Sequence, residues 1–220
     1  MASNVPSPSI RTPIPHPRAV LFDLDGTLLD SFSAHFQAYK EMFSKFHIRV
    51  TKKAFLHAYS PDWYRTYEAF RLPREHWSTA DKYWLESAAR QKPRLLPGVY
   101  VALRKLRHGT RVGLVSSGSK QRVLKDLARN RISDTFEVIV TGDDTDFPKP
   151  HPDGLLRAMK HMRLEPQQTL YVGDAEEDFE MSRAAGVLFI GVKSAFSGLR
   201  SGSYMIVNGV AKLPALLIRK

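Results

Sequence analysis

The spacing of hydrophobic and polar positions changes several times along the chain, and each change predicts an element. Residues 20–22 form a short apolar run of strand character that stops at two acidic residues, Asp23 and Asp25. From 32 to 46, apolar residues recur instead at the spacing of one helix face. Two further segments of helical character follow, at about 51–59 and 74–91.

Beyond residue 95, short apolar runs alternate with amphipathic stretches. The expected strands are 111–115, 136–140, 169–172, 187–192 and 204–207. The expected helices are 98–108, 119–130, 152–162 and 176–185. Strands that alternate with helices indicate an α/β fold, Rossmann-like, whose mostly parallel sheet carries helices on both faces.

Composition divides the chain into three parts. Residues 1–18 are rich in proline, which removes backbone donors and blocks helix formation, so we expect a disordered or extended arm. Residues 30–94 hold all three tryptophans and many other aromatic residues, which predicts a small inserted helical domain. Its aromatic residues form either a core or a ligand cage. The α/β core domain then comprises 19–29 and 95–220.

Charge and cysteine usage limit the possible functions. The chain of 220 residues has no cysteine, which excludes thiolate catalysis and cysteine-ligated metals. It has no apolar run of the roughly 18 residues that a membrane span needs and no signal-peptide pattern, so we expect a cytoplasmic protein without a membrane partner. The net charge of +11 is spread along the chain. We therefore expect no specific nucleic-acid partner, and the excess charge suits steering of an anionic substrate.

The first predicted strand ends in a pair of carboxylates. Alternation along the strand allows Asp23 and Asp25 to share one side at its carboxyl end, where open α/β sheets bind ligands. Two carboxylates so close repel each other unless a cation, a proton or hydrogen bonds compensate. The alternative is a turn with two solvated aspartates.

Two later strands are followed by groups that suit a phosphate. Ser116, Ser117 and Gly118 offer hydroxyls and backbone N–H groups where a helix begins, although a serine there also serves as a helix cap. Lys149 lies between two prolines, which restrict its direction and favour a fixed ammonium. A solvated lysine in a proline-rich turn is the alternative.

A fourth strand end adds two carboxylates. Asp174 follows the strand and Asp178 lies one helical turn later on the same side. Either they serve the helix dipole, or they join the first pair. Carboxylates, hydroxyls and one lysine at neighbouring strand ends suit a Mg²⁺ site, because this hard cation prefers oxygen ligands.

With these motifs together, the chain resembles the haloacid dehalogenase-like hydrolase superfamily from about residue 19 to its C-terminal region. The family's motifs appear in order as Asp23-Leu24-Asp25-Gly26-Thr27, Val115-Ser116, Lys149-Pro150, and Gly173-Asp174 with Asp178. The insertion resembles the family's helical C1-type cap.

The resemblance implies a mechanism. Asp23 would attack phosphorus and form an aspartyl-phosphate that water later hydrolyses. Asp25 would be the general acid for the leaving alkoxide and then the base for that water. Ser116 and Lys149 would hold phosphoryl oxygens. The family's Mg²⁺ would be held by Asp23, the backbone carbonyl of Asp25, Asp174 and Asp178. Further substrate contacts are expected from Thr27, Ser117 and Gly118.

The branch of the family is expected from smaller signals. The family's dehalogenases lack the second aspartate, so Asp25 favours a phosphatase of a small phosphorylated metabolite, similar to phosphoglycolate phosphatases. His35 resembles the first cap helix of β-phosphoglucomutase-like enzymes, and Arg65 and Trp63 are further cap candidates for substrate contact. A sugar-phosphate mutase or a phosphonate hydrolase of the same superfamily stays open as an alternative. So do a non-catalytic phospho-Asp signalling domain and a nucleic-acid-binding domain, and the chain is expected to be a monomer or homodimer.

Overall fold

The computed structural model describes residues 16–59, 63–194, 199 and 204–217 and divides the chain into two compact units. One unit combines Met1–Leu28 with Leu95–Lys220, and the other is Leu29–Arg94. The expected proline-rich arm falls largely outside the described residues, which begin at residue 16.

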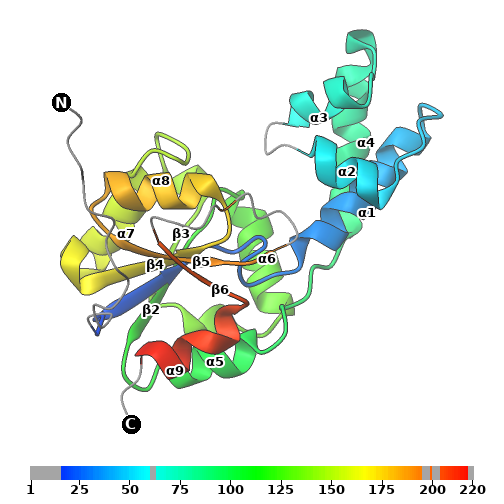
Figure 1. Ribbon diagram of the computed structural model, residues 1–220. Coiled ribbons are helices and arrows are strands. Elements are labelled where there is room, and N and C mark those ends of the chain that lie inside the picture. The colour runs from blue at the N-terminus through cyan, green and yellow to red at the C-terminus, as the bar shows by residue number, and fades with distance from the viewer. Residues whose placement is uncertain (1–15, 60–62, 195–198, 200–203, 218–220) are drawn as a thin grey trace, which may run out of the picture. The chain divides into compact units, whose positions relative to one another are not determined.

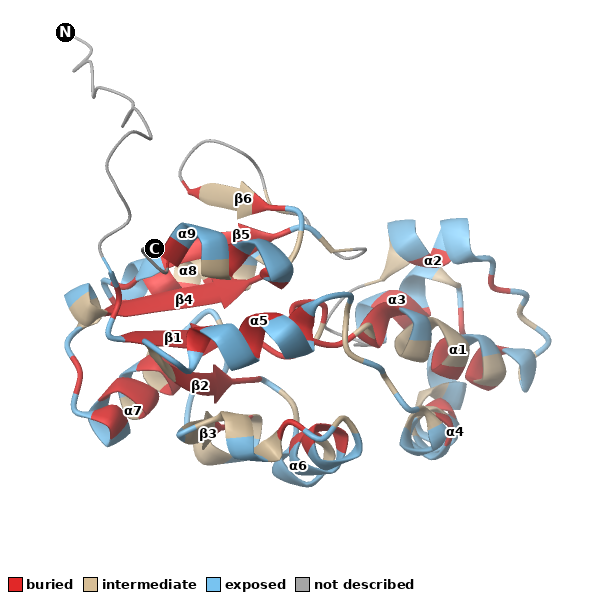
Figure 2. Ribbon diagram, turned by 90° about the horizontal axis from the view of Figure 1, so that it is seen from below, coloured by how far each residue is buried: buried red, intermediate tan, exposed pale blue. Residues whose placement is uncertain are grey.

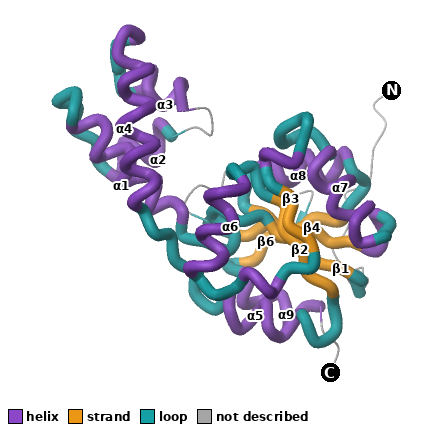
Figure 3. Tube along the Cα trace, turned by 180° about the vertical axis from the view of Figure 1, so that it is seen from behind, coloured by secondary structure: helices purple, strands orange, loops and turns teal. Residues whose placement is uncertain are grey.

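The first unit is built on a six-stranded sheet in the order β3-β2-β1-β4-β5-β6 (Figures 1 and 3). Every described strand pair is parallel, which confirms the Rossmann-like α/β prediction. The strands are β1 Ala19–Phe22, β2 Arg111–Val115, β3 Val138–Val140, β4 Thr169–Gly173, β5 Leu188–Val192 and β6 Met205–Val207. The strand order reverses at β1, and ligands bind at the carboxyl ends of the strands beside such a reversal.

Helices cover both faces of this sheet (Figure 1). One face carries α5 Val99–Leu106 and α9 Leu213–Leu217, and the other carries α7 Asp153–Met162 and α8 Glu176–Ala184. All four residues of β1 are fully buried, and Figure 2 shows β1 and β4 as buried strands. A strand buried on both sides needs a continuous apolar run, which is the pattern that predicts it.

The second unit consists of helices around an aromatic core. Its helices are α1 Ser31–Ser44, α2 Lys52–Ala58, α3 Trp63–Ala69 and α4 Trp77–Arg90. The ring of Tyr39 lies 5.2 Å from that of Phe55, 6.4 Å from that of Tyr67 and 5.8 Å from that of Trp84. Of the two interpretations of these aromatic residues, the packing favours a core.

Two short helices escape the sequence analysis. The five residues of α9 are too few for a helical period to emerge from the pattern, whereas α3 is as long as the predicted α2. The longest described helices, α1 and α4, have 14 residues each, and no described helix is long and apolar enough to cross a membrane.

A substitution at Leu21 tests how much the central strand contributes to the stability of the first unit. The side chain of Leu21 is fully buried in the core cluster beneath α7 and α8. We expect Leu21→Ala to lower the free energy of unfolding by about 2–5 kcal/mol, because it leaves a cavity in a closely packed core. Urea unfolding measures this loss. The matched control is Leu188→Ala on β5, whose side chain is 46% exposed. Equal losses in both variants would contradict a core centred on β1.

Candidate active site

The site begins where β1 ends. Asp23 is buried, and its backbone N–H donates to the carbonyl of Val172 on β4 at 2.8 Å, which continues the sheet pairing by one residue. The chain then turns at Gly26, whose φ is +81°. A Cβ at this glycine would lie 2.2 Å from Oδ2 of Asp174, so only glycine lets the turn approach that carboxylate so closely.

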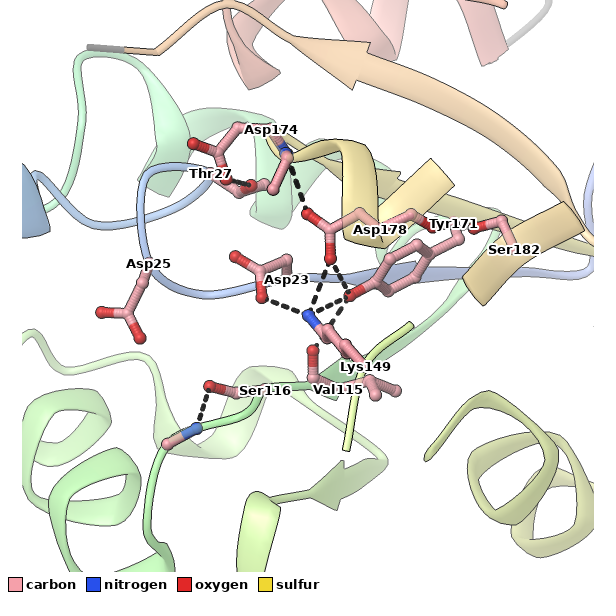
Figure 4. Close-up of polar contacts among 12 residues, drawn as sticks. Asp23, Asp25, Thr27, Val115, Ser116, Lys149, Tyr171, Asp174, Asp178 and Ser182 are labelled. Carbon is pink, nitrogen blue, oxygen red and sulfur yellow. Dashed lines mark hydrogen bonds and ion pairs between the residues drawn. The ribbon is translucent and has the colours of Figure 1, made fainter. Parts of the chain in front are cut away.

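A single ammonium connects the strand ends (Figure 4). Nζ of Lys149 donates to Oδ1 of Asp23 at 2.6 Å, to Oδ1 of Asp178 at 2.8 Å and to the hydroxyl of Tyr171 at 2.9 Å. The Tyr171 hydroxyl lies 3.0 Å from the carbonyl of Val115, to which it donates. Since an ammonium has three N–H donors, these three contacts use all of them. The sequence analysis missed Tyr171, because the pattern of a buried strand does not distinguish a functional tyrosine from a residue of the hydrophobic core.

The two later carboxylates are held by different groups. Oδ2 of Asp178 accepts hydrogen bonds from the backbone N–H groups of Asp174 and Ala175, each at 3.1 Å. The Asp174 carboxylate accepts from the hydroxyl of Thr27 at 3.2 Å and from that of Ser194. Asp178 is thereby fixed at both oxygens, whereas Asp174 is oriented by two hydroxyls.

Burial governs the electrostatics of this cluster. It raises the pKa of Asp23 well above its ordinary value, because the nearby Lys149 only partly offsets desolvation and the other carboxylates add to it. Burial also raises the pKa of Asp174 to about 7, and the charge of Asp178 adds to this shift. Burial lowers the pKa of Lys149, but the attraction of Asp178 and Asp23 outweighs that effect and leaves the pKa raised. If all three carboxyl groups were ionised, the cluster would carry more negative charge than one ammonium neutralises, so it favours a bound proton or a cation.

The same three carboxylates fit a divalent cation. Asp23, Asp174 and Asp178 each offer an oxygen, and these oxygens lie within 4.8 Å of one another at buried positions. Their oxygen chemistry suits Mg²⁺. Because Asp178 already receives Lys149 and two backbone N–H groups, Asp23 and Asp174 have the greater capacity for direct coordination.

Asp25 has a different partner from Asp23. Its oxygens accept two hydrogen bonds from the guanidinium of Arg122, at 3.0 and 2.5 Å, and Figure 4 shows it apart from the Lys149 cluster. Arg122 lies on α6 Lys120–Arg129, and its Nη1 is also 3.5 Å from Asp126. The sequence analysis missed Arg122. Its only local signal is the spacing to Asp126, which is that of an ordinary helical ion pair.

The predicted phosphate loop lies at the end of β2. Ser116 is buried, and its Oγ accepts from the backbone N–H of Gly118 at 3.2 Å, whereas Ser117 is exposed. The carbonyl of Gly118 accepts from the N–H of Gly142 at 2.9 Å, which ties the loop to the segment after β3. The loop therefore has a defined shape, with the hydroxyl of Ser116 on the buried side.

The expected cap residues belong to the helical unit. Nδ1 of His35 is within hydrogen-bond distance, 3.2 Å, of the hydroxyl of Tyr59, and Arg65 is exposed. The side chain of Trp63 lies outside the described part of the structure. Substrate contact by these residues stays a prediction.

Comparisons with known proteins add the family. A family model described as haloacid dehalogenase-like hydrolase matches residues 20–192. Pyrophosphatase PpaX of Bacillus mycoides is 27% identical over 184 residues, which cover 81% of this chain and 85% of that protein. A phosphoglycolate phosphatase of Photorhabdus laumondii is 27% identical over 192 residues, 82% of each chain.

A solved structure shares the fold. The crystal structure of a predicted phosphoglycolate phosphatase from Haemophilus somnus superimposes with a TM-score of 0.80 at 17% identity, over 91% of this chain and 98% of that one. At this identity the likeness speaks for the fold alone. The family model supplies the rest: the chain belongs to the haloacid dehalogenase-like hydrolases, and it is an enzyme of the phosphatase kind.

Proposed function

We propose that this chain is a Mg²⁺-dependent phosphatase of a small phosphorylated metabolite, with Asp23 as the nucleophile. The observation that carries the proposal is the contact between Nζ of Lys149 and Oδ1 of Asp23, 2.6 Å long, within a cluster of three buried carboxylates. The cluster lies where strands β1 and β4 end, at the edge where sheets of this kind bind ligands.

The reaction proceeds in two displacements. First, a carboxylate oxygen of Asp23 bonds to phosphorus, the bond from phosphorus to the leaving oxygen breaks, and Asp25 gives that oxygen a proton. Then Asp25 takes a proton from water, the water oxygen bonds to phosphorus, and the acyl phosphate bond to Asp23 breaks. Free phosphate and the original carboxylate result, so one difficult step becomes two easier ones.

Positive charge makes the first attack possible. A carboxylate that approaches a phosphate dianion meets repulsion, which Lys149 reduces from a fixed position. Mg²⁺, when bound by Asp23 and Asp174, supplies further positive charge at the transferring oxygens. Ser116 donates its hydroxyl to one phosphoryl oxygen, and Thr27 keeps Asp174 oriented through their 3.2 Å hydrogen bond.

The names of the relatives support a proposal for the class of substrate. The proteins named phosphoglycolate phosphatase and pyrophosphatase are each 27% identical to this chain, which supports a small anionic phosphate compound. A phosphonate hydrolase would use a desolvated lysine of the helical unit. The four lysines suited to that role are exposed, which favours a phosphatase: Lys40, Lys45, Lys52 and Lys53.

The helical unit Leu29–Arg94 is, in this proposal, the cap that selects the leaving group. It is inserted between the first and second motifs, directly after the turn that carries Asp25. His35 and Arg65 are the cap side chains proposed to contact substrate. The cap's aromatic core gives them a stable support.

Replacement of the nucleophile tests the mechanism. We expect Asp23→Asn to lower kcat by roughly 10⁴-fold, because the amide cannot form the aspartyl-phosphate. Phosphate release from p-nitrophenyl phosphate with Mg²⁺ measures this. Asp146→Asn, whose side chain is 77% exposed, is the matched control and should retain activity. Full activity in Asp23→Asn would refute the nucleophile assignment.

The raised pKa of Asp174 gives a pH test of the cation site. Burial raises this pKa to about 7, above the roughly 3.9 of an unfolded chain. Without metal, the stability that protonated Asp174 contributes is therefore present at low pH and is lost as pH rises through about 7. Asparagine stays neutral, so Asp174→Asn should gain stability relative to the wild type as pH rises from about 4 to about 7, and the difference should level off above that.

Urea unfolding in a chelator, and again with Mg²⁺, measures both effects. Mg²⁺ should stabilise the wild type more at the higher pH, because its ligands are then deprotonated, and should stabilise Asp174→Asn much less. Asp146→Asn should follow the wild type in every condition. A stability difference between the wild type and Asp174→Asn that does not change with pH would contradict the proton binding at Asp174.

A further inference from the structure

Arg122 lies between two parts of the proposed catalytic site. Its guanidinium holds Asp25 with two hydrogen bonds, at 3.0 and 2.5 Å. It also lies directly against the loop after β2, since a Cβ at Gly118 would be 2.0 Å from its Nη2. A side chain at position 118 would therefore displace this guanidinium from its present place beside the loop.

The guanidinium of Arg122 has N–H donors that do not bind Asp25. It carries five N–H groups, and two of them bind Asp25. Its remaining close polar contact within the described residues is the 3.5 Å approach of Nη1 to Asp126, so Nε–H has no hydrogen-bond partner there. The side chain is 36% exposed, which leaves these donors within reach of a ligand.

Another cation of α6, Lys120, already has an acidic partner. Lys120 donates to Asp144 at 3.1 Å, in the segment after β3. Arg122, by contrast, binds Asp25 through two of its nitrogens. In the proposed function, Asp25 meets the leaving group, so Arg122 lies on the leaving-group side of the phosphoryl site.

We propose that Arg122 is a specificity residue that binds a second anionic group, a carboxylate or a second phosphate, on the leaving group of the substrate. This inference rests on the proposed function and narrows its substrate class to small phosphate esters or anhydrides with two anionic ends. A guanidinium forms paired hydrogen bonds with either kind of oxyanion. Once Asp25 has given up its proton, Arg122 also offsets the negative charge of this carboxylate, which would otherwise repel such a leaving group.

Matched substrates separate the charge of the leaving group from the rest of the reaction. Phosphoglycolate is compared with 2-hydroxyethyl phosphate, in which an uncharged hydroxymethyl group replaces the carboxylate. Pyrophosphate is compared with acetyl phosphate, an anhydride of comparable or greater intrinsic reactivity that lacks the second phosphate. We expect the wild type to show a kcat/KM roughly 10- to 100-fold higher for the charged member of at least one pair, and the pair that responds identifies the anion.

Two variants of Arg122 test its part in that preference. Arg122→Gln should lower kcat/KM for charged and uncharged substrates alike through the loss of its two hydrogen bonds to Asp25. It should lower kcat/KM for the charged substrate by roughly a further 10-fold or more, chiefly by raising KM, and so abolish the preference. Arg122→Lys keeps the charge without the paired geometry and should retain part of the preference. Arg129→Gln removes a positive charge from the same helix, 4.0 Å from Asp126, and should leave the preference intact.

The outcomes separate this inference from the function it rests on. An equal loss on charged and uncharged substrates in Arg122→Gln would overturn it, since the arginine would then act only through Asp25. A wild type that hydrolyses all four compounds without preference would overturn it too, while the phosphatase proposal stands. A wild type with no Asp23-dependent hydrolysis of phosphate compounds would overturn both.

Discussion

The site depends on the ion pairs of one buried ammonium, that of Lys149. The side chain of Lys149 is 12% exposed and lies between the carboxylates of Asp23 and Asp178, which are 9% and 2% exposed. Removal of one partner from such a group leaves an uncompensated buried charge, which costs about 3–5 kcal/mol. Through Tyr171 the same Nζ is linked to the carbonyl of Val115, so the ends of β1, β2 and β4 meet at one nitrogen.

The parallel sheet supplies the geometry that this arrangement needs. Because β1 pairs with β2 on one side and β4 on the other, all three strands deliver their carboxyl ends to the same edge. Asp23, Ser116 and Asp174 directly follow those three ends. Residues far apart in sequence thus reach one cluster through the sheet alone, while glycine at position 26 lets the turn close against it.

The sequence predicts the strands with a clear apolar pattern and the polar residues that follow their ends. The strand 111–115 is found within its observed bounds, because a buried strand between glycine- and serine-rich turns has a sharp pattern. Asp23 and Asp174 directly follow the neighbouring strands β1 and β4, so topology predicts that they meet, and Lys149 lies in the segment after β3. Tyr171 and Arg122 could not be found in this way, since a buried tyrosine resembles core, and the partner of Arg122 is 97 residues away in sequence.

The two aspartates of the first motif differ in the cation with which each forms an ion pair. Asp23 is bound by Lys149 inside the buried cluster, and Asp25 by Arg122 at the more exposed side, where its side chain is 27% accessible. The alternation of a strand alone would leave both carboxylates on one side and repelling each other. Separate counter-charges instead give each carboxylate its own direction, one toward Lys149 and one toward Arg122. The different roles proposed for two residues of the same type therefore follow from which cation each one meets.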